Sequence, residues 1–254
     1  MTRFVTDHTQ LHTLDKDNRN FSVDCNICKS RNFSVFNNLN EPELAHFNDH
    51  KSCIDYKKGQ YIFHENSYPQ GVYCVNSGKV KIVRTGKDGK DQIVRLARDG
   101  DILGYRALLG DSKYNGSAIT LEDTNVCFIS KASFFSVIHS NGSLSSNIIK
   151  MLASELGKAE QSITDISQKP VKERMAEALL LLKDTYGLEA DGATIAVILS
   201  REDMASLLGI ATETAIRLLS AFKQNGILEF VGKKIKIMDK DQLLRGANLM
   251  TDLS

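Results

Sequence analysis

The most constraining feature of this sequence is the apolar pattern of residues 201–237. Met204, Ala205 and Leu208 give a short helix one apolar face. Gly209 stands where that helix must end and the chain must turn sharply. A second helix follows, with apolar residues at spacings of three and four: Ala215, Leu218, Leu219 and Phe222. Because the small Ala205 allows close packing, the pattern predicts a helix-turn-helix, whose second helix can enter the DNA major groove.

Two short apolar segments follow the second helix and are separated by a tight turn. Residues 227–230 and 234–238 are predicted strands around Gly232, and such a hairpin after a helix-turn-helix is a wing. Any helical hairpin can show the same periodicity, but the helix pair and the wing together favour DNA binding. Basic side chains suited to phosphate contact gather on the second helix and wing: Arg217, Lys223, Lys233, Lys234 and Lys236.

Between residues 57 and 130 the sequence changes to short segments of Val, Ile, Tyr and Phe that alternate with polar residues and break at glycines. A strong hairpin-turn sequence, Lys-Asp-Gly-Lys, lies among them at 87–90. Many short strands at near-regular spacing predict an antiparallel barrel or sandwich. The expected strands are residues 60–64, 71–75, 78–85, 92–96, 102–103, 117–120 and 125–130.

A long amphipathic helix is predicted over residues 143–168, before Pro170. Its apolar residues form a heptad seam, with intervals of 3, 4, 3, 4 and 3: Ile149, Leu152, Leu156, Ala159, Ile163 and Ile166. One alternative is a helix that packs against its own domain. The narrow and sustained stripe favours a two-stranded dimer seam instead.

The remaining segments give weaker signals. Residues 1–20 are polar and indicate a loosely ordered tail. Short helices are expected over residues 41–48, with Asn40 as the N-cap, and over 133–139. A further amphipathic helix is expected over residues 171–186, and a strand edge over 194–199.

The length, net charge, apolar content and cysteine count limit the class of protein. The chain has 254 residues, enough for two domains, and a net charge of +1, which implies no general polyanion-binding surface. No apolar run reaches the length of a membrane helix, and the N-terminus lacks a signal-peptide core, so we expect a cytoplasmic protein without membrane contact. The five cysteines are an odd number, which argues against a disulfide framework.

The order of these segments resembles that of the CRP/FNR superfamily of bacterial transcription regulators. The resemblance covers about residues 40–240 and is strongest at 57–82, in Gly-Asp-Ile-Leu-Gly at 100–104 and in the winged helix. It implies an α+β chain of four parts. They are a tail with a Cys-x-x-Cys segment (1–38), a cyclic-nucleotide-binding-like β-roll or jelly roll (39–142), a dimerisation helix (143–168) and a winged helix-turn-helix (169–254).

The same resemblance implies partners and base contacts. It implies a homodimer on a two-fold pseudo-palindrome in double-stranded DNA, in contact with RNA polymerase. The family's base-reading positions fall on Thr212, Glu213, Ile216 and Arg217. A carboxylate accepts from cytosine N4, and a guanidinium donates two bonds to guanine, so Glu213 and Arg217 are the expected base readers. The alternative is a surface ion pair, since the two residues are four apart on one helix.

In the nucleotide-sensing branch of the family, a glutamate binds the ribose and an arginine binds the cyclic phosphate. The matching segments here are Gly104, Tyr105 and Arg106, and then Gly116 followed by Ser117 and Ala118. Tyrosine replaces the glutamate and glycine replaces the arginine. Because a buried phosphate without a cation is costly, we expect an effector other than cyclic AMP, or none.

The oxygen-sensing branch holds an iron–sulfur cluster through cysteines. Cys25 and Cys28 have ligand spacing, and Cys127 lies where the distant ligand would be, so the three are candidate ligands. The expected third N-terminal cysteine is absent, because Ser34 and Asn37 occupy that stretch. No metal or other cofactor is therefore expected, although an iron–sulfur cluster or a thiol switch stays open.

The sequence thus favours a sequence-specific DNA-binding regulator that is not an enzyme. A redox sensor on the same scaffold, using a cluster or thiols, is the alternative. A cupin-like enzyme is a third possibility, but the six histidines are scattered and lack the paired spacing of such a metal centre.

Overall fold

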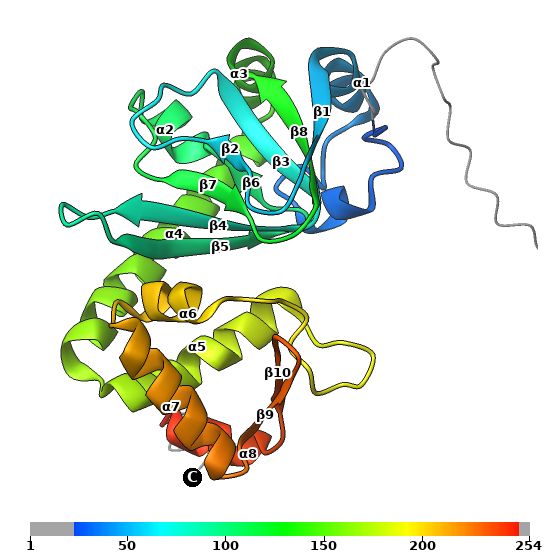
Figure 1. Cartoon of the computed structure of the whole chain (residues 1–254). Helices are drawn as coiled ribbons and strands as arrows, with labels where there is room; N and C mark the ends of the chain where they lie inside the picture. Colours follow the sequence, from blue (N-terminus) through cyan, green and yellow to red (C-terminus); the bar gives the residue numbers. More distant parts are fainter. Residues whose placement is uncertain (1–22, 249–254) are drawn as a thin grey trace, which may run out of the picture.

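The computed structural model describes residues 23–248 and consists of a β-roll and a winged-helix domain joined by one long helix (Figure 1). This arrangement confirms the α+β class expected from the sequence. The expected tail at 1–20 lies outside the described residues.

The N-terminal segment packs a 3₁₀ turn, η1 (Lys29–Phe33), and helix α1 (Glu41–His50) on the roll. Asn40 caps α1 as expected: its side chain accepts from the backbone amide of Glu43 at 3.0 Å. The Glu43 carboxylate accepts in return from the Asn40 amide at 2.9 Å, which completes a capping box.

The roll consists of two four-stranded antiparallel sheets that enclose an apolar core (Figure 1). The first sheet has the order β1 (Lys51–Tyr56), β8 (Thr124–Ser130), β3 (Gly71–Ser77) and β6 (Ile102–Leu103). The second has the order β2 (Tyr61–Phe63), β7 (Ser117–Thr120), β4 (Lys79–Thr85) and β5 (Asp91–Arg98). Side chains from both sheets fill the space between them, among them Ile62, Val75, Val80, Ala118 and Val126.

All seven expected strands are present, but sequence reasoning missed β1 and the short helix α2 (Tyr105–Leu109). The strand pattern of β1 is weak because Cys53 is its one fully buried residue, whereas the neighbouring Ile54 is 41 % exposed. Periodicity alone therefore gave β1 no clear buried face.

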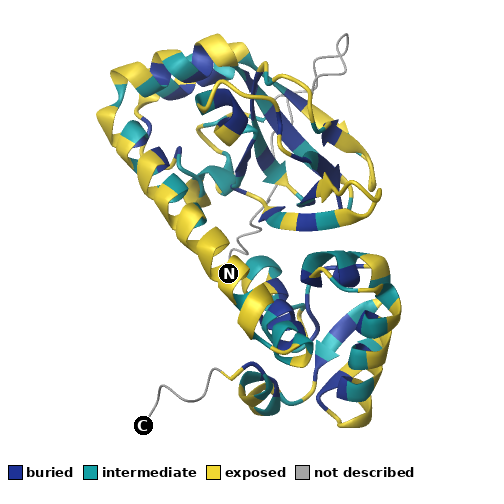
Figure 2. Cartoon of the chain, turned by 90° about the vertical axis from the view of Figure 1, so that its left-hand side faces the viewer, coloured by how far each residue is buried: buried dark blue, intermediate teal, exposed yellow. Residues whose placement is uncertain are grey.

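Helix α3 (Lys131–Ser140) leads into the long helix α4 (Gly142–Gln168). The Asn141 side chain accepts from the amide of Leu144 at 2.9 Å and so fixes the start of α4. Leu144 and Ile148 are buried against the roll. The contact with the roll continues as far as Glu155, and the later turns of the helix are largely exposed (Figure 2).

The winged-helix domain comprises α5 (Val171–Tyr186), α6 (Arg201–Leu208), α7 (Thr212–Gln224), β9 (Leu228–Val231), β10 (Lys234–Ile237) and α8 (Lys240–Gly246). Its core is contiguous and draws Met175, Leu179, Met204, Leu219 and Leu243 from four of these helices. The C-terminal α8 gave no recognised signal in the sequence.

The strand edge expected at residues 194–199 is wrong. Only single-residue bridges form there, between Thr194 and Lys236 and between Leu188 and Ile195. From Ile195 the chain continues without a further bridge to Ser200, the N-cap of α6. Within residues 23–248, no single helix is long and apolar enough to cross a membrane, although α6 and α7, bent by 103°, together meet the length and composition test.

Candidate nucleic-acid interface

The second helix of the helix-turn-helix, α7, is held by α6 and by the turn between them. Ser200 and Asp203 form a capping box at the start of α6. Gly209 ends α6 in the left-handed conformation, with φ 64°, which a glycine adopts without the steric cost of a Cβ. Ala205, 3 % exposed, lets α7 approach closely, and Ala215 and Leu219 bury the inner face of α7.

The opposite face of α7 is open to solvent. Glu213, Ile216 and Arg217 are exposed, and Thr212 is half-buried. Ile216 is 45 % exposed, although an apolar side chain of this size is usually buried. Among the described residues, no ion pair joins Glu213 to Arg217, so both groups are free to meet a partner from outside.

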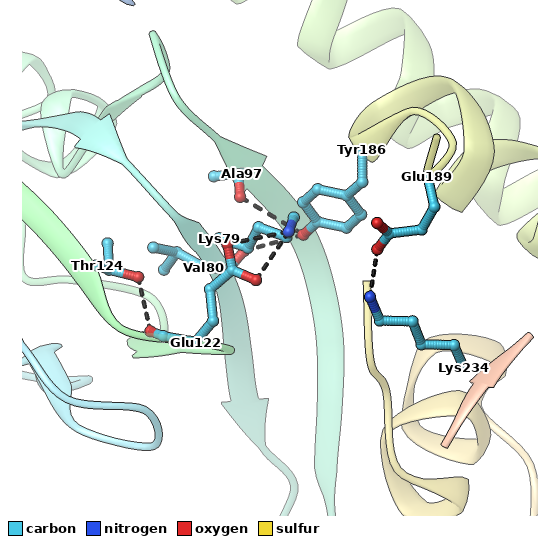
Figure 3. Close-up of polar contacts among 8 residues, drawn as sticks. All are labelled: Lys79, Val80, Ala97, Glu122, Thr124, Tyr186, Glu189 and Lys234. Carbon is cyan, nitrogen blue, oxygen red and sulfur yellow. Dashed lines mark hydrogen bonds and ion pairs between the residues drawn. The ribbon is translucent and has the colours of Figure 1, made fainter. Parts of the chain in front are cut away.

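The wing presents two of the expected phosphate contacts differently. Lys233 is exposed in the turn between β9 and β10. Lys234 forms an ion pair with Glu189, which approaches from the loop after α5 (Figure 3). Lys236 lies 3.5 Å from Asp191 in a second pair. Lys233 is therefore the more available cation of the two candidates.

The expected dimer stripe is exposed to solvent along α4 (Figure 2). Four of its six residues are large, apolar and at least 60 % exposed: Ile149, Leu156, Ile163 and Ile166. Ala159 is also exposed, whereas Leu152 packs partly against the roll core. A row of exposed apolar side chains on one helix is unusual for a monomer and is typical of a surface that a partner covers.

The residues of the expected effector pocket already contact other parts of the chain. Tyr105 is 1 % exposed, and its hydroxyl donates to the carboxylate of Glu155 on α4. Burial raises the pKa of Tyr105, and the Glu155 contact adds to that rise while Arg95 opposes it. Arg95 and Arg106 approach the same carboxylate at 3.3 and 3.8 Å, so Arg106 faces a glutamate.

The second segment of that pocket leaves no room for a cation. Ala118 is fully buried, and the Ser117 hydroxyl accepts from the Glu65 amide at 2.9 Å. A Cβ at Gly116 would lie 2.7 Å from the carbonyl oxygen of Val83, so no arginine fits at this position. These residues do not fit a cyclic nucleotide bound through a ribose carboxylate and a phosphate cation.

The cysteines depart from two expectations. The structure joins Cys53 and Cys127 in a single disulfide, whereas the odd number of cysteines argued against a disulfide framework. Pairing of β1 with β8 brings the two Cα atoms to 4.0 Å despite a separation of 74 residues, which no sequence spacing reveals.

The same bond corrects the assignment of Cys127 as a candidate cluster ligand, because its sulfur is already bonded to Cys53. Cys25 and Cys28 are free thiols. Among residues 23–248, no three or more His, Cys, Asp or Glu side chains are arranged to hold a metal ion.

A contact between the roll and the winged-helix domain was missed from the sequence. The Tyr186 hydroxyl at the end of α5 lies 3.5 Å from the carbonyl oxygens of both Val80 and Ala97 (Figure 3). The ammonium of Lys79 lies 5.9 Å from the centre of the Tyr186 ring and pairs with Glu122 at 2.8 Å.

This contact between the roll and the winged-helix domain, here called the interdomain seam, continues onto α6. The Ser206 hydroxyl donates to the carbonyl oxygen of Asp91 at 2.7 Å and accepts from the Ile93 amide at 2.9 Å. Lys81 pairs with Asp203; burial would raise the pKa of Asp203, but Lys81 and Ser200 hold it below its usual value. The roll thus contacts α6, the helix that supports α7. These contacts join residues that are more than 100 positions apart in the sequence.

These contacts place the roll next to the N-terminal end of α7. A groove of about 870 Å³ lies between the β4–β5 turn and the α6–α7 turn, and Thr212 and Glu213 line it. Two of the expected base-reading residues therefore border the roll.

Comparison with known proteins identifies both parts of the chain. Residues 53–141 match the model of the cyclic nucleotide-binding domain, and residues 173–245 match the Crp-like helix-turn-helix domain. A protein of Mycobacterium tuberculosis named CRP-like cAMP-activated global transcriptional regulator is 25 % identical over 84 % of this chain and 96 % of its own length. The anaerobic regulatory protein of Bacillus subtilis is 29 % identical over 74 % of this chain and 80 % of its own.

Solved structures agree with these relatives. FixK2 from Bradyrhizobium japonicum superposes with a TM-score of 0.68 at 27 % identity and covers 77 % of this chain and 96 % of its own. A CRP/FNR-family protein from Eubacterium rectale superposes with a TM-score of 0.69 over 85 % of this chain and 99 % of its own, and at 20 % identity it supports the fold alone.

Proposed function

The chain belongs to the CRP/FNR superfamily of transcription regulators, and we propose that it acts as a homodimer that reads a two-fold pseudo-palindrome in double-stranded DNA. The observation that carries this proposal is the outward face of α7, where Glu213 and Arg217 are exposed and not paired with each other. The bare stripe on α4 supports the homodimer, because pairing two copies would bury it.

The roles of the individual residues follow from their chemistry. Arg217 donates two bonds to a guanine, and Glu213 accepts from a cytosine, in each half-site. Thr212 and Ile216 flank them and contact the outer bases. Lys233 binds phosphate, and Lys234 does so once it leaves Glu189.

The protein acts in the cytoplasm, where its DNA target lies, and it contacts RNA polymerase when it activates transcription. It carries out no catalysis, and the roll serves as a sensor or scaffold. Its effector is not cyclic AMP, despite the name of the mycobacterial relative, because Tyr105 and Gly116 replace the groups such a ligand needs. No cofactor is required for DNA binding.

Replacing Arg217 with alanine tests the base contacts. Binding is measured by fluorescence anisotropy on the preferred duplex and on duplexes with each base pair changed. The variant should lose about 1–3 kcal/mol of discrimination at one base pair in each half-site, and little elsewhere. Lys223→Ala is the matched control, since it removes an exposed cation from the end of the same helix. Equal weakening on every duplex by Arg217→Ala would show that Arg217 only binds phosphate.

A further inference from the structure

One carboxylate on α4 is held by three side chains of the roll. The Tyr105 hydroxyl donates to Glu155 Oε2, and Arg106 Nε lies 3.8 Å from the same oxygen. Arg95 Nη2 lies 3.3 Å from the other carboxylate oxygen, Oε1. Groups from β5 and α2 therefore engage both oxygens of Glu155, although Tyr105 is 50 residues away from it in the sequence.

The roll also holds Arg95 through contacts of its own. Arg95 Nη1 donates to the carbonyl oxygen of Ile102 at 3.3 Å, and the guanidinium carbon lies 5.6 Å from the centre of the Tyr105 ring. The side chains of Arg95 and Glu155 are 18 % and 19 % exposed. Because water screens a partly buried pair only weakly, the attraction between these two charges is stronger than it would be at the surface.

The site contains more positive than negative charge. Arg95 and Arg106 bring two positive charges, and Glu155 is the one carboxylate among the described residues that pairs with either. Without Glu155, Arg95 would be a largely buried cation with only the Ile102 carbonyl oxygen and the Tyr105 ring as partners, which is costly. The three roll side chains therefore form an anion-binding site, and a carboxylate of the same chain fills it.

Glu155 is also the last residue of α4 that makes a polar contact with the roll. Leu152 packs partly against the roll core, whereas Leu156 is 62 % exposed. Within residues 156–168, all of them described, the side-chain hydrogen bonds and ion pairs stay on α4 or reach Lys169. Glu155 thus fixes the helix at the point from which its remaining turns lead to the winged-helix domain (Figure 2).

We propose that Glu155 is the anionic ligand of the roll, so that α4 is held in place for DNA binding with no small anion supplied from solution. This proposal rests on the proposed function, because α4 would set where the two winged-helix domains of the homodimer lie. A small anion would have to displace Glu155 to reach Arg95. DNA binding therefore needs no added effector.

Replacing Glu155 with alanine empties the anion site and leaves room for a small carboxylate. In sodium chloride, Glu155→Ala should bind the preferred duplex at least about fivefold more weakly than the wild type. Sodium acetate at the same ionic strength should restore most of this loss, because acetate brings a carboxylate to Arg95 and Arg106. Wild-type protein and Glu160→Ala, which loses an exposed carboxylate of the same helix, show the effect of the two salts alone.

A second variant separates charge from packing. Glutamine fills the space of Glu155 without the negative charge, so Glu155→Gln should also bind the duplex more weakly. Acetate has no room to enter this variant and should not restore its affinity. Thermal unfolding followed by circular dichroism makes the same comparison without DNA: acetate should raise the midpoint of Glu155→Ala and leave that of Glu155→Gln unchanged relative to the wild type.

Three results would overturn the proposal: wild-type affinity in Glu155→Ala, no restoration by acetate, or a dialysed wild type that binds DNA only after a small molecule is added. Failure of the proposed function gives a different result, in which the wild type binds no duplex under any condition. In that case the unfolding midpoints still decide whether Glu155 fills an anion site.

Discussion

At the scale of the residue, the candidate interface depends on which charges are already paired within the chain. Arg217 and Lys233 are exposed, whereas Lys234 is engaged by Glu189. The sequence placed both lysines correctly in the wing, but it gave no sign of this pair, because Glu189 lies 45 residues away in another segment. A basic residue in a DNA-binding motif is thus available to phosphate only to the extent that no carboxylate of its own chain is paired with it.

Removing the competing carboxylate gives a direct prediction. Glu189→Gln frees Lys234, so affinity for any duplex should rise, and the slope of log affinity against log salt should steepen by about 0.9 for each lysine freed. Binding measured by anisotropy between about 50 and 200 mM salt checks it. Glu41→Gln, an exposed position on α1, changes net charge equally and should leave the slope unaltered. A steeper slope in both variants would mean that net charge, and not Lys234, is responsible.

At the scale of the element, local patterns predicted most of the fold. The 3.6-residue periodicity located α4, α5, α6 and α7, and alternation with glycine breaks located seven of the eight roll strands. The failures have a common cause. Strand β1, the Cys53–Cys127 bond and the Ser206 contacts are fixed by segments distant in sequence, and no local pattern records such pairings.

The candidate site was predicted to a similar extent. Exposure of Glu213, Ile216 and Arg217 followed from the apolar face opposite them on α7. The seam between the roll and α6 did not follow, because Lys81 and Asp203 are 122 residues apart. The sequence therefore predicted which residues form the outer face of α7, but not that the roll lies beside the helix-turn-helix.

The turn between α6 and α7 yields a prediction about an element. Gly209→Ala places a Cβ on a left-handed residue and 3.1 Å from Gln92 of the roll, so unfolding free energy should fall by about 1–2 kcal/mol. Urea unfolding followed by circular dichroism measures it. Gly142→Ala, where φ is not positive and a Cβ meets open space, should be neutral or slightly stabilising. Equal effects of the two substitutions would rule out backbone strain at Gly209.

At the scale of the whole molecule, α4 sets how two copies would be placed in the proposed homodimer. Its first turns are buried against the roll and its later turns carry the exposed stripe, so one helix links the roll, the winged-helix domain and the surface proposed for a second copy (Figure 2). Glu155, held by Tyr105 and Arg95, ties the roll to the middle of this helix. The seam at Tyr186 and Ser206 ties the roll to the DNA-binding domain by a second route.

The stripe leads to a prediction about oligomeric state. Ile163→Lys puts a charge into the apolar stripe and should shift the protein from dimer to monomer in light-scattering measurements of molar mass. Ser154→Lys adds the same charge on the opposite side of the heptad, at an exposed position, and should stay dimeric. A wild-type protein that is monomeric at all concentrations, or an Ile163→Lys dimer, would show that α4 is not the interface.

The most direct test of the central claim is selection of duplexes from a random library by the full-length protein, followed by sequencing. We predict enrichment of a motif with two-fold symmetry, whose half-sites are centred about one helical turn apart and each contain a conserved G·C pair. Absence of any enriched sequence, or enrichment of a single asymmetric site, would contradict the account.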